Sequence, residues 1–312
     1  MEKSMLKKHT VLKRIIHDKK ITTGQIALLT VMLVAAIMTA IPILFVFVSA
    51  FTDENVLAEA GYGLFPSKLS LNGFNTVFKY EKQLLISYGV TIFVAFSGTV
   101  FGLLVMSMYG YVLTRRDFPL RKFLTVFLII PMLFSGGQLS SYIVYTSLYH
   151  MKDNILLLIL PQSMQTLYVI ILRTYIVSSV PRELMDAAKI DGAGEYTTFF
   201  RIVFPLMKPA LAAVGFMTAA MYWNDWQNAL LFMESNTKKP LQLLLIDIQK
   251  SIETILSNRN IPPSALAAMQ GRIPQYSATM ATVVVVIVPI MLAYPFFQKY
   301  FIKGLTLGSV KE

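Results

Sequence analysis

The sequence predicts an all-α integral membrane protein with six transmembrane helices. Of its 312 residues, 55% are hydrophobic and only 14% are charged, whereas charged residues make up about a quarter of a typical soluble domain. The mean hydropathy is +0.59, which also excludes an intrinsically disordered chain. Six apolar runs reach the length of about 20 residues that a helix needs to cross a bilayer core.

The six runs are residues 27–51, 86–113, 123–149, 155–177, 210–233 and 278–298. The first carries no charge and exceeds the apolar stretch of a signal peptide, so we expect a retained helix, although Val48-Ser49-Ala50 weakly resembles a cleavage site. The third contains Pro131 and Gly136-Gly137. These residues are compatible with a broken helix or with close packing of an intact one, and both readings stay open.

The distribution of charge predicts that both termini are cytoplasmic. With the N-terminus inside, 19 of the 28 Lys and Arg residues fall in inner segments and nine in outer ones, while the acidic residues outside the spans divide evenly. Basic residues accumulate on the cytoplasmic side of membrane proteins. The net charge of +11 therefore indicates orientation, and no nucleic-acid partner is expected. A basic N-terminal segment (1–26) and a tail (299–312) lie inside.

Two long segments lie outside, residues 52–85 and 234–277, and the spans from 86 to 298 form a five-helix core. Within the second outer segment, residues 241–256 have apolar side chains at helical spacing.

The chain has no cysteine, which excludes disulfides and cysteine chemistry. It also lacks a phosphate-binding P-loop, and its three histidines are not paired within a span. We therefore expect no catalytic, cofactor-binding or metal-binding residue, which argues against a membrane enzyme.

The inner segment 178–209 predicts two short helices joined by a glycine turn. Pro181 and Glu183 suit a helix start. Leu184, Ala187, Ala188 and Asp191 fall on one helical face, and Gly192 follows as a stop. A second short helix runs from Glu195 to Phe204. A plain connection would normally need about four to six residues, so we expect a docking element for a partner protein.

This segment resembles the EAA loop found in membrane subunits of carbohydrate-type ABC importers, within the maltose-transporter-like family. Asp186-Ala187-Ala188, Gly192, Ile202 and Phe204-Pro205 occupy the motif positions at the family spacing. Asp186 replaces Glu and Phe204 replaces Leu, which keeps the charge and the bulk. Residues 190–193, 223–225 and the tail 303–311 also resemble the oligosaccharide and lipoprotein-linked branch.

The resemblance implies a permease subunit in a bacterial cell membrane. Its partners would be a second homologous permease, two ATP-binding subunits that hold ATP and magnesium, an extracellular solute-binding protein, a carbohydrate and membrane lipid. The residues implied in coupling to the ATPase are Glu183, Asp186, Ala187, Ala188, Asp191 and Gly192. Asp186 is also expected to hold Arg201. In related importers the outer loop at this position can reach the binding protein, with Gly271-Arg272 as the candidate tip here, but the residues themselves favour an ordinary surface loop.

Polar and aromatic residues gather in the outer halves of three predicted spans. Asp225 is the one acidic residue within a span, about 22 Å from the inner end of its helix at 1.5 Å per residue. Amides, hydroxyls and aromatic rings suit a sugar. The candidate substrate path comprises Gln138, Tyr142, Tyr145, Gln162, Gln165, Asn224, Asp225 and Asn228.

Two alternatives remain at this stage. Polar side chains also join helices to one another, and aromatic residues also form interfacial belts. For the whole protein, the alternative is a self-sufficient six-helix channel or a secondary carrier for a polar solute. Such a carrier usually places several ionisable groups at mid-membrane, and this chain offers only Asp225 and the peripheral Arg173.

Overall fold

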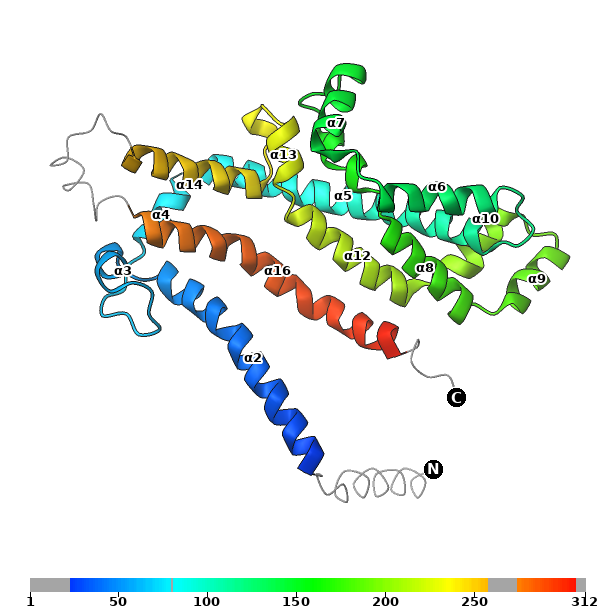
Figure 1. Cartoon of the computed structure of the whole chain (residues 1–312), viewed down its shortest axis with the longest axis horizontal. Helices are drawn as coiled ribbons and strands as arrows, with labels where there is room; N and C mark the ends of the chain where they lie inside the picture. Colours follow the sequence, from blue (N-terminus) through cyan, green and yellow to red (C-terminus); the bar gives the residue numbers. More distant parts are fainter. Residues whose placement is uncertain (1–22, 80, 258–273, 307–312) are drawn as a thin grey trace.

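The computed structural model describes residues 23–79, 81–257 and 274–306, and this part of the chain is almost entirely helical (Figure 1). In it the only β pairing is an isolated bridge between Thr52 and Leu69. The outer segment and first spans contain α2 (Thr23–Ala50), α3 (Glu54–Ala60), α4 (Asn72–Phe78), α5 (Glu81–Thr114), α6 (Arg121–Leu133) and α7 (Gly137–Ile143). The middle contains η1 (Val144–Leu148), η2 (Ile155–Leu158), η3 (Leu160–Gln162), α8 (Thr166–Ser179), α9 (Arg182–Ile190), α10 (Glu195–Thr198), η4 (Phe199–Val203) and α11 (Phe204–Leu206). The last part contains α12 (Lys208–Trp223), α13 (Gln227–Phe232), η5 (Asn236–Lys238), α14 (Leu241–Ser257) and α16 (Gln275–Thr306).

Three unbroken helical stretches among the described residues are long and apolar enough to cross a membrane: Thr23–Ala50, Glu81–Thr114 and Gln275–Pro295. Three more candidates are bent pairs. The angles are 114° between Arg121–Leu133 and Gly137–Leu148, 51° between Ile155–Gln162 and Thr166–Ser179, and 80° between Glu195–Leu206 and Lys208–Trp223. By length and composition, the described residues hold up to six spans if each bent pair counts as one. The last pair joins part of the inner segment 178–209 to α12 and therefore does not coincide with the predicted run 210–233.

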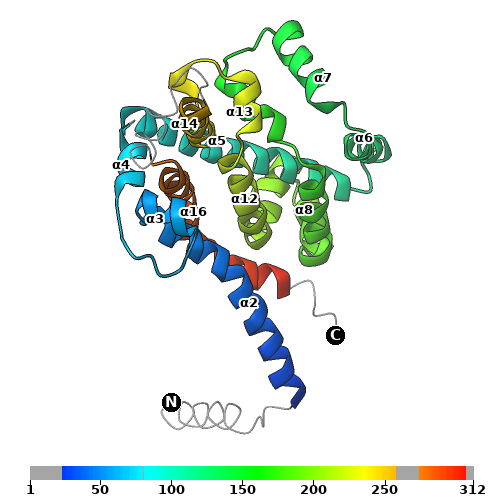
Figure 2. The ribbon, with the colours of Figure 1, turned by 60° about the vertical axis from the view of Figure 1, so that its left-hand side comes forward.

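The third apolar run is a broken helix. α6 ends at Leu133, and α7 begins at Gly137, whose φ is +77°. A side chain at this position would be strained because L-residues rarely adopt positive φ. Of the two readings that the sequence left open, the structure therefore supports the break. α7 projects away from the body of the molecule (Figures 1 and 2).

The fourth and fifth runs also differ from continuous helices. The fourth opens with the short 3₁₀ turns η2 and η3, which contain Pro161, and regular helix begins only at Thr166. Proline lacks the amide proton that a helix interior requires. The fifth run is regular from Lys208 to Trp223, pauses at residues 224–226, and resumes as α13.

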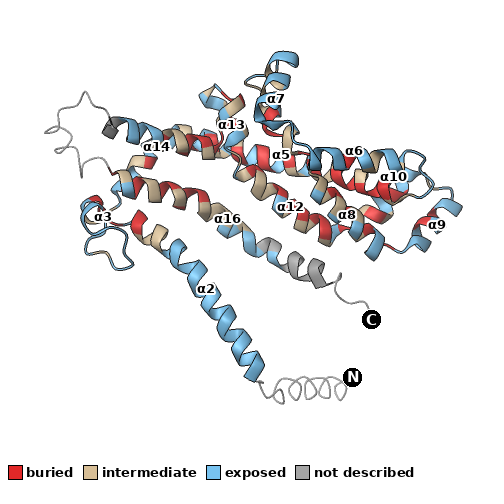
Figure 3. Ribbon diagram, viewed as in Figure 1, coloured by how far each residue is buried: buried red, intermediate tan, exposed pale blue. Residues whose placement is uncertain are grey.

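The core forms around α5, which packs against α8 and α12, while α16 packs against α2, α4 and α12. The helices α5 and α12 approach each other closely where one of them carries a small residue. A Cβ on Gly98 of α5 would lie 2.5 Å from the ring of Tyr222 on α12. The buried strip along α5 and α12 is visible in Figure 3.

The helix α2 packs on the body through its C-terminal end, where Val46, Phe47 and Ala50 join an apolar cluster with α16. Its remaining side chains, from Thr23 to Leu44, are exposed (Figure 3). A long apolar helix of this kind needs lipid or another protein around it.

The outer segment 52–85 is fastened to the start of α16. The carboxylate of Glu54, which is 6% exposed, accepts hydrogen bonds from the amides of Tyr276 and Ser277 and from the Ser277 hydroxyl, at 2.8–3.0 Å. A carboxylate at a helix N-terminus satisfies free amides and complements the helix dipole.

The amphipathic stretch at 241–256 is confirmed as the helix α14. Its residues Leu241, Leu244, Leu245 and Ile248 are buried against α16 and its neighbours. Most of the basic N-terminal segment, the loop around Gly271-Arg272 and the end of the tail lie outside the described residues.

Candidate functional site

The inner segment 178–209 forms the expected helix–turn–helix. α9 is followed by Asp191 and then by Gly192 at φ +77°. The amide of Ala193 donates to the carbonyl of Ala188 at 2.8 Å, and that of Gly192 to Lys189 at 3.2 Å. These two bonds form a Schellman motif, which satisfies the last carbonyls of the helix and needs a left-handed residue where Gly192 stands.

α9 projects at one end of the molecule, opposite α3, α4 and α14 (Figure 1). Five of the six predicted coupling residues are exposed, namely Glu183, Asp186, Ala187, Asp191 and Gly192. Ala188 is instead buried and, like Met185, faces inward. The exposed face also carries Leu184 and Ile190, with 45% and 87% of their surface accessible. The combination of acids and exposed apolar side chains suits contact with another protein.

The expected pairing of Asp186 with Arg201 is not among the ion pairs of the described residues, and both residues are exposed. The second half of the loop is held by Glu195 instead. One of its carboxylate oxygens accepts from Arg115 at 2.7 Å, and the other accepts from the hydroxyl of Tyr111 at 2.6 Å. No sequence pattern predicts this contact, because Tyr111 and Arg115 lie about 80 residues earlier.

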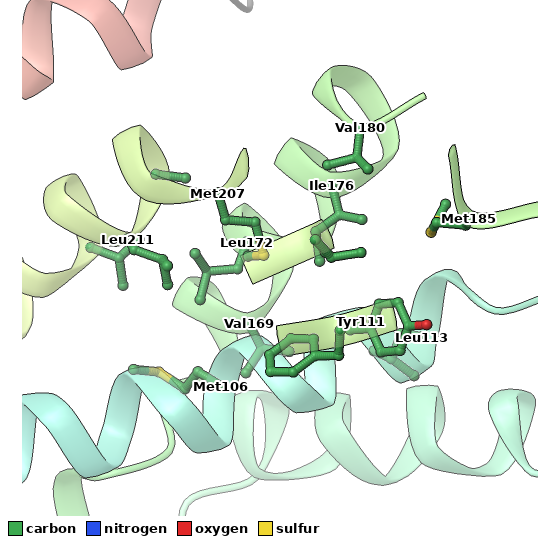
Figure 4. Packing of buried hydrophobic residues seen from close by; sticks show 14 of the residues in the cluster. Met106, Tyr111, Leu113, Val169, Leu172, Ile176, Val180, Met185, Met207 and Leu211 are labelled. Atoms are coloured by element: carbon green, nitrogen blue, oxygen red, sulfur yellow. The ribbon is translucent and has the colours of Figure 1, made fainter. Parts of the chain in front are cut away.

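An apolar cluster lies beneath the loop and joins it to the membrane helices (Figure 4). It is built from Met106, Tyr111 and Leu113 of α5, Val169, Leu172 and Ile176 of α8, Met185 of α9, Phe199 and Val203 of η4, and Met207, Ala210 and Leu211 around the start of α12. Because α5, α8 and α12 all contribute, displacement of the loop is opposed by three membrane helices.

The structure brings together three of the predicted path residues. The Gln162 amide donates to the carboxylate of Asp225, whose oxygens also accept from the backbone amide of Asn228 at 3.2 Å and its side-chain amide at 2.9 Å. Asp225 thus caps the short helix α13 and fastens it to η3. The Oε1 atom of Gln162 is buried without a hydrogen-bond partner.

Asn224 lies beside this cluster and is exposed. Its side chain donates to the carbonyl of Ala220 at 2.8 Å and accepts from Gln242 of α14 at 3.1 Å. The pause between α12 and α13 therefore presents Asn224, Trp226 and Gln227 at an accessible rim. Sequence periodicity did not find Gln227 or Gln242, because it assumed one continuous helix through this region.

The remaining predicted path residues separate into two groups. Tyr142 and Tyr145 pack on Phe232 of α13, with ring centroids 6.2 and 5.8 Å apart. Gln138 is exposed on α7, and Gln165 stands at the start of α8. The expected face through Gln162, Gln165 and Thr166 is interrupted, because the helix breaks at residues 163–165. Gln138, Tyr142 and Tyr145 all follow the break at residues 134–136, on the continuous stretch of α7 and η1.

Residues 98–307 match the family of binding-protein-dependent transport system inner membrane components. The chain belongs to this family, whose members are the membrane subunits of ABC importers and leave ATP hydrolysis to a separate subunit. Family membership disfavours a self-sufficient channel or carrier. The EAA motif recognised at 186–205 is typical of the same family.

Several curated relatives align over most of the chain. Protein LplC of Bacillus subtilis is 35% identical over 273 residues, covering 88% of this chain and 90% of the relative. The polygalacturonan/rhamnogalacturonan transport system permease protein YtcP of the same species is 33% identical, with coverage of 90% and 95%. The arabinooligosaccharides transport system permease protein AraQ of Halalkalibacterium halodurans is 32% identical, with coverage of 88% and 92%.

A solved structure supports the same fold. A chain of a bacterial ABC transporter involved in the import of the acidic polysaccharide alginate superposes with a TM-score of 0.73 at 22% identity, covering 91% of this chain and 99% of that one. This similarity concerns the fold, and the family assignment rests on the matches above.

Proposed function

We propose that this chain forms half of the transmembrane path for a sugar or oligosaccharide, which an extracellular binding protein delivers and a separate ATPase drives across. The observation that carries the proposal is the projecting helix α9, with its exposed acidic and apolar side chains next to the left-handed turn at Gly192. Relatives whose printed names include arabinooligosaccharides and polygalacturonan support a carbohydrate as the solute.

The coupling helix docks on the ATP-binding subunit through Glu183, Asp186, Ala187, Asp191 and Gly192, while Ala188 lets the helix lie close to its own chain. Both termini are cytoplasmic in this arrangement, and the complex contains a second homologous permease and two ATP-binding subunits in a bacterial cell membrane. The exposed apolar length of α2 supports a neighbouring membrane protein or lipid around that helix.

Purification with native partners tests this function. Affinity isolation of the tagged chain from its own membranes is expected to recover an ATP-binding subunit and a second permease. After reconstitution into vesicles, the complex should import a sugar only with ATP and the binding protein present. Transport by a lone oligomer of this chain, without ATP, would contradict the proposal.

The solute path follows the outer-side rim where α12 gives way to α13. Asn224 is the accessible amide there. The aromatic rings of Tyr142 and Tyr145 pack on Phe232 of the adjoining helix α13. Asp225, Gln162 and Asn228 hold the helix break in place, and Gln138 and Gln165 line the approach from α7 and α8. Amides bond sugar hydroxyls, and aromatic faces cover the apolar faces of the sugar ring.

Replacement of Asn224 distinguishes solute contact from structural support. Asn224→Ala should lower uptake about three- to tenfold, as expected for the loss of one or two neutral hydrogen bonds, without loss of assembly. Asn236→Ala is the matched control, because Asn236 is also an exposed asparagine and belongs to η5, which contributes no candidate path residue. Equal uptake by both variants would contradict a role of Asn224 in the path.

A further inference from the structure

The coupling loop is attached to the C-terminal end of α5 by a polar contact of three side chains. Glu195, the first residue of α10, accepts from Arg115 at 2.7 Å and from Tyr111 at 2.6 Å. The guanidinium of Arg115 also lies over the ring of Tyr111, 5.8 Å from its centroid. We refer to Tyr111, Arg115 and Glu195 as the loop clamp.

The loop clamp differs from an ordinary surface ion pair, which contributes little. Although the Glu195 side chain is 59% exposed, that of Arg115 is only 15% exposed and Tyr111 is 4% exposed. Glu195 is the only side-chain acceptor that the Tyr111 hydroxyl and the Arg115 guanidinium have in the described structure. Loss of its carboxylate would leave two largely buried donors unsatisfied, which costs more than the contact itself contributes.

Packing next to the loop clamp is incomplete. A cavity of about 340 Å³ separates part of the α5 end from the loop, and its lining includes Met108, Val112, Phe118 and Tyr196 together with the clamp residues. Phe199 also lines the cavity, and its ring lies 5.3 Å from that of Tyr111. Beside the cavity, the connection between the loop and α5 therefore combines this ring contact with the hydrogen bonds of Glu195.

A second ion pair in the same region offers a contrast. Lys189 of α9 lies 3.4 Å from Asp117, and the two side chains are 64% and 78% exposed. Like Arg115 and Glu195, Lys189 and Asp117 are oppositely charged and join the loop to the region at the end of α5. Water screens this second pair, however, and neither of its side chains is buried. It should contribute little to the attachment of the loop.

The other end of α5 is tied to the outer elements. The Tyr88 hydroxyl donates to the carbonyl of Val285 in α16 at 2.8 Å, and the Thr91 hydroxyl accepts from the amide of Leu241 in α14 at 2.8 Å. α5 thus connects the coupling loop with α14 and α16 as one unbroken helix of 34 residues.

We propose that Glu195 is a positioning residue that transmits movement of the ATPase-docked loop to α5, and through α5 to the outer side of the permease. The inference rests on the proposed function, since it assumes that α9 docks on the ATP-binding subunit. Without the carboxylate, only apolar packing joins the loop to this end of α5 among the described residues, so α5 follows the movement of the loop less completely. ATP hydrolysis then continues with less solute imported per ATP.

The test compares Glu195→Gln with Lys189→Gln in the full purified complex, reconstituted in vesicles. The measured quantity is solute imported per ATP hydrolysed, which a general loss of folding or assembly would leave unchanged. Glu195→Gln should lower this ratio about tenfold, the scale of a lost hydrogen bond to a charged group, while Lys189→Gln keeps it. The double variant Glu195→Gln with Arg115→Gln should be no worse than the worse single variant, because the two residues act as one unit.

A normal ratio in Glu195→Gln would overturn the inference, as would an equal fall of the ratio in Lys189→Gln. If Glu195→Gln does not assemble, Tyr111→Phe takes its place, because it removes one hydroxyl and keeps the ion pair. A smaller fall of the ratio in Tyr111→Phe supports the inference, and an unchanged ratio overturns it. Failure of the wild-type complex to couple ATP to import would instead refute the proposed function.

Discussion

At the residue scale, Asp153 joins the turn before η2 to the residues that follow α13. It has a φ of +57° and lies between η1 and η2. Its carboxylate accepts from the amides of Glu234 and Ser235, both at 3.1 Å, from the Ser235 hydroxyl, and from Lys238 at 2.9 Å. These bonds, above all those from Ser235, hold the pKa of Asp153 well below its ordinary value.

This contact should make stability depend on pH. Because the folded-state pKa is depressed, the contribution is complete above the pKa of about 3.9 of an unfolded Asp and declines as the pH falls below it. Asp153→Asn should lower the melting temperature at pH 7, and the difference from wild type should shrink towards pH 3. Thermal unfolding of the purified protein across this range measures it.

Asp117→Asn serves as the control, since both side chains of the ion pair between Asp117 and Lys189 are exposed. This substitution should change the melting temperature little at any pH. A difference between Asp153→Asn and wild type that grows towards pH 3 would contradict the assignment.

At the element scale, the turn after α9 rests on the backbone conformation of one glycine. A Cβ on Gly192 or on Gly194 would meet no atom within 4 Å, but only Gly192 has a positive φ. The two glycines thus differ in backbone strain and not in available space. Gly192→Ala should cost about 1–2 kcal/mol in this conformation, and Gly194→Ala should cost less.

The expected consequence is a coupling helix that no longer keeps its orientation. In reconstituted complexes, Gly192→Ala should lower solute import per ATP hydrolysed, and a bulkier residue such as Val should lower it further. Gly194→Ala should stay near wild type. Similar ratios for Gly192→Ala and Gly194→Ala would mean that the left-handed turn is not needed for coupling.

At the scale of the whole molecule, the two ends of the long axis should lie on opposite sides of the membrane. The native chain has no cysteine, so single cysteines report position without background. Phe65, 95% exposed, lies in the outer segment, and Ile190, 87% exposed, ends α9. In intact cells a membrane-impermeant maleimide should label Phe65→Cys but not Ile190→Cys.

Permeabilised cells provide the control, since both cysteines should then react. Labelling of Ile190→Cys in intact cells would place the coupling loop outside and refute the orientation inferred from the charges. Labelling of neither variant after permeabilisation would show that these side chains are covered by partners, which the exposure of Phe65 in the single chain does not favour.

The features that the sequence predicted well are those determined by neighbouring residues. Residues 27–51 and 278–298 correspond to α2 and to most of α16 because a long uncharged run leaves a chain in lipid no alternative to a helix. The turn at Gly192 was predictable because its bonds join residues within the same short segment. The EAA-like motif is likewise read from residues that lie close together in the chain, whereas the orientation that the charge bias indicates stays a prediction.

Tertiary structure decided where helices break and which distant groups meet. The pause at residues 224–226 depends on Asp225 binding Gln162, 63 residues earlier, and the loop clamp joins Glu195 to residues about 80 positions before it. Helical periodicity carries no information on such contacts, because it describes only which residues share a face. By itself the sequence therefore determined the family of a membrane permease and the helix–turn–helix at residues 178–209. Packing of distant helices decided how that loop is held and which polar side chains remain accessible.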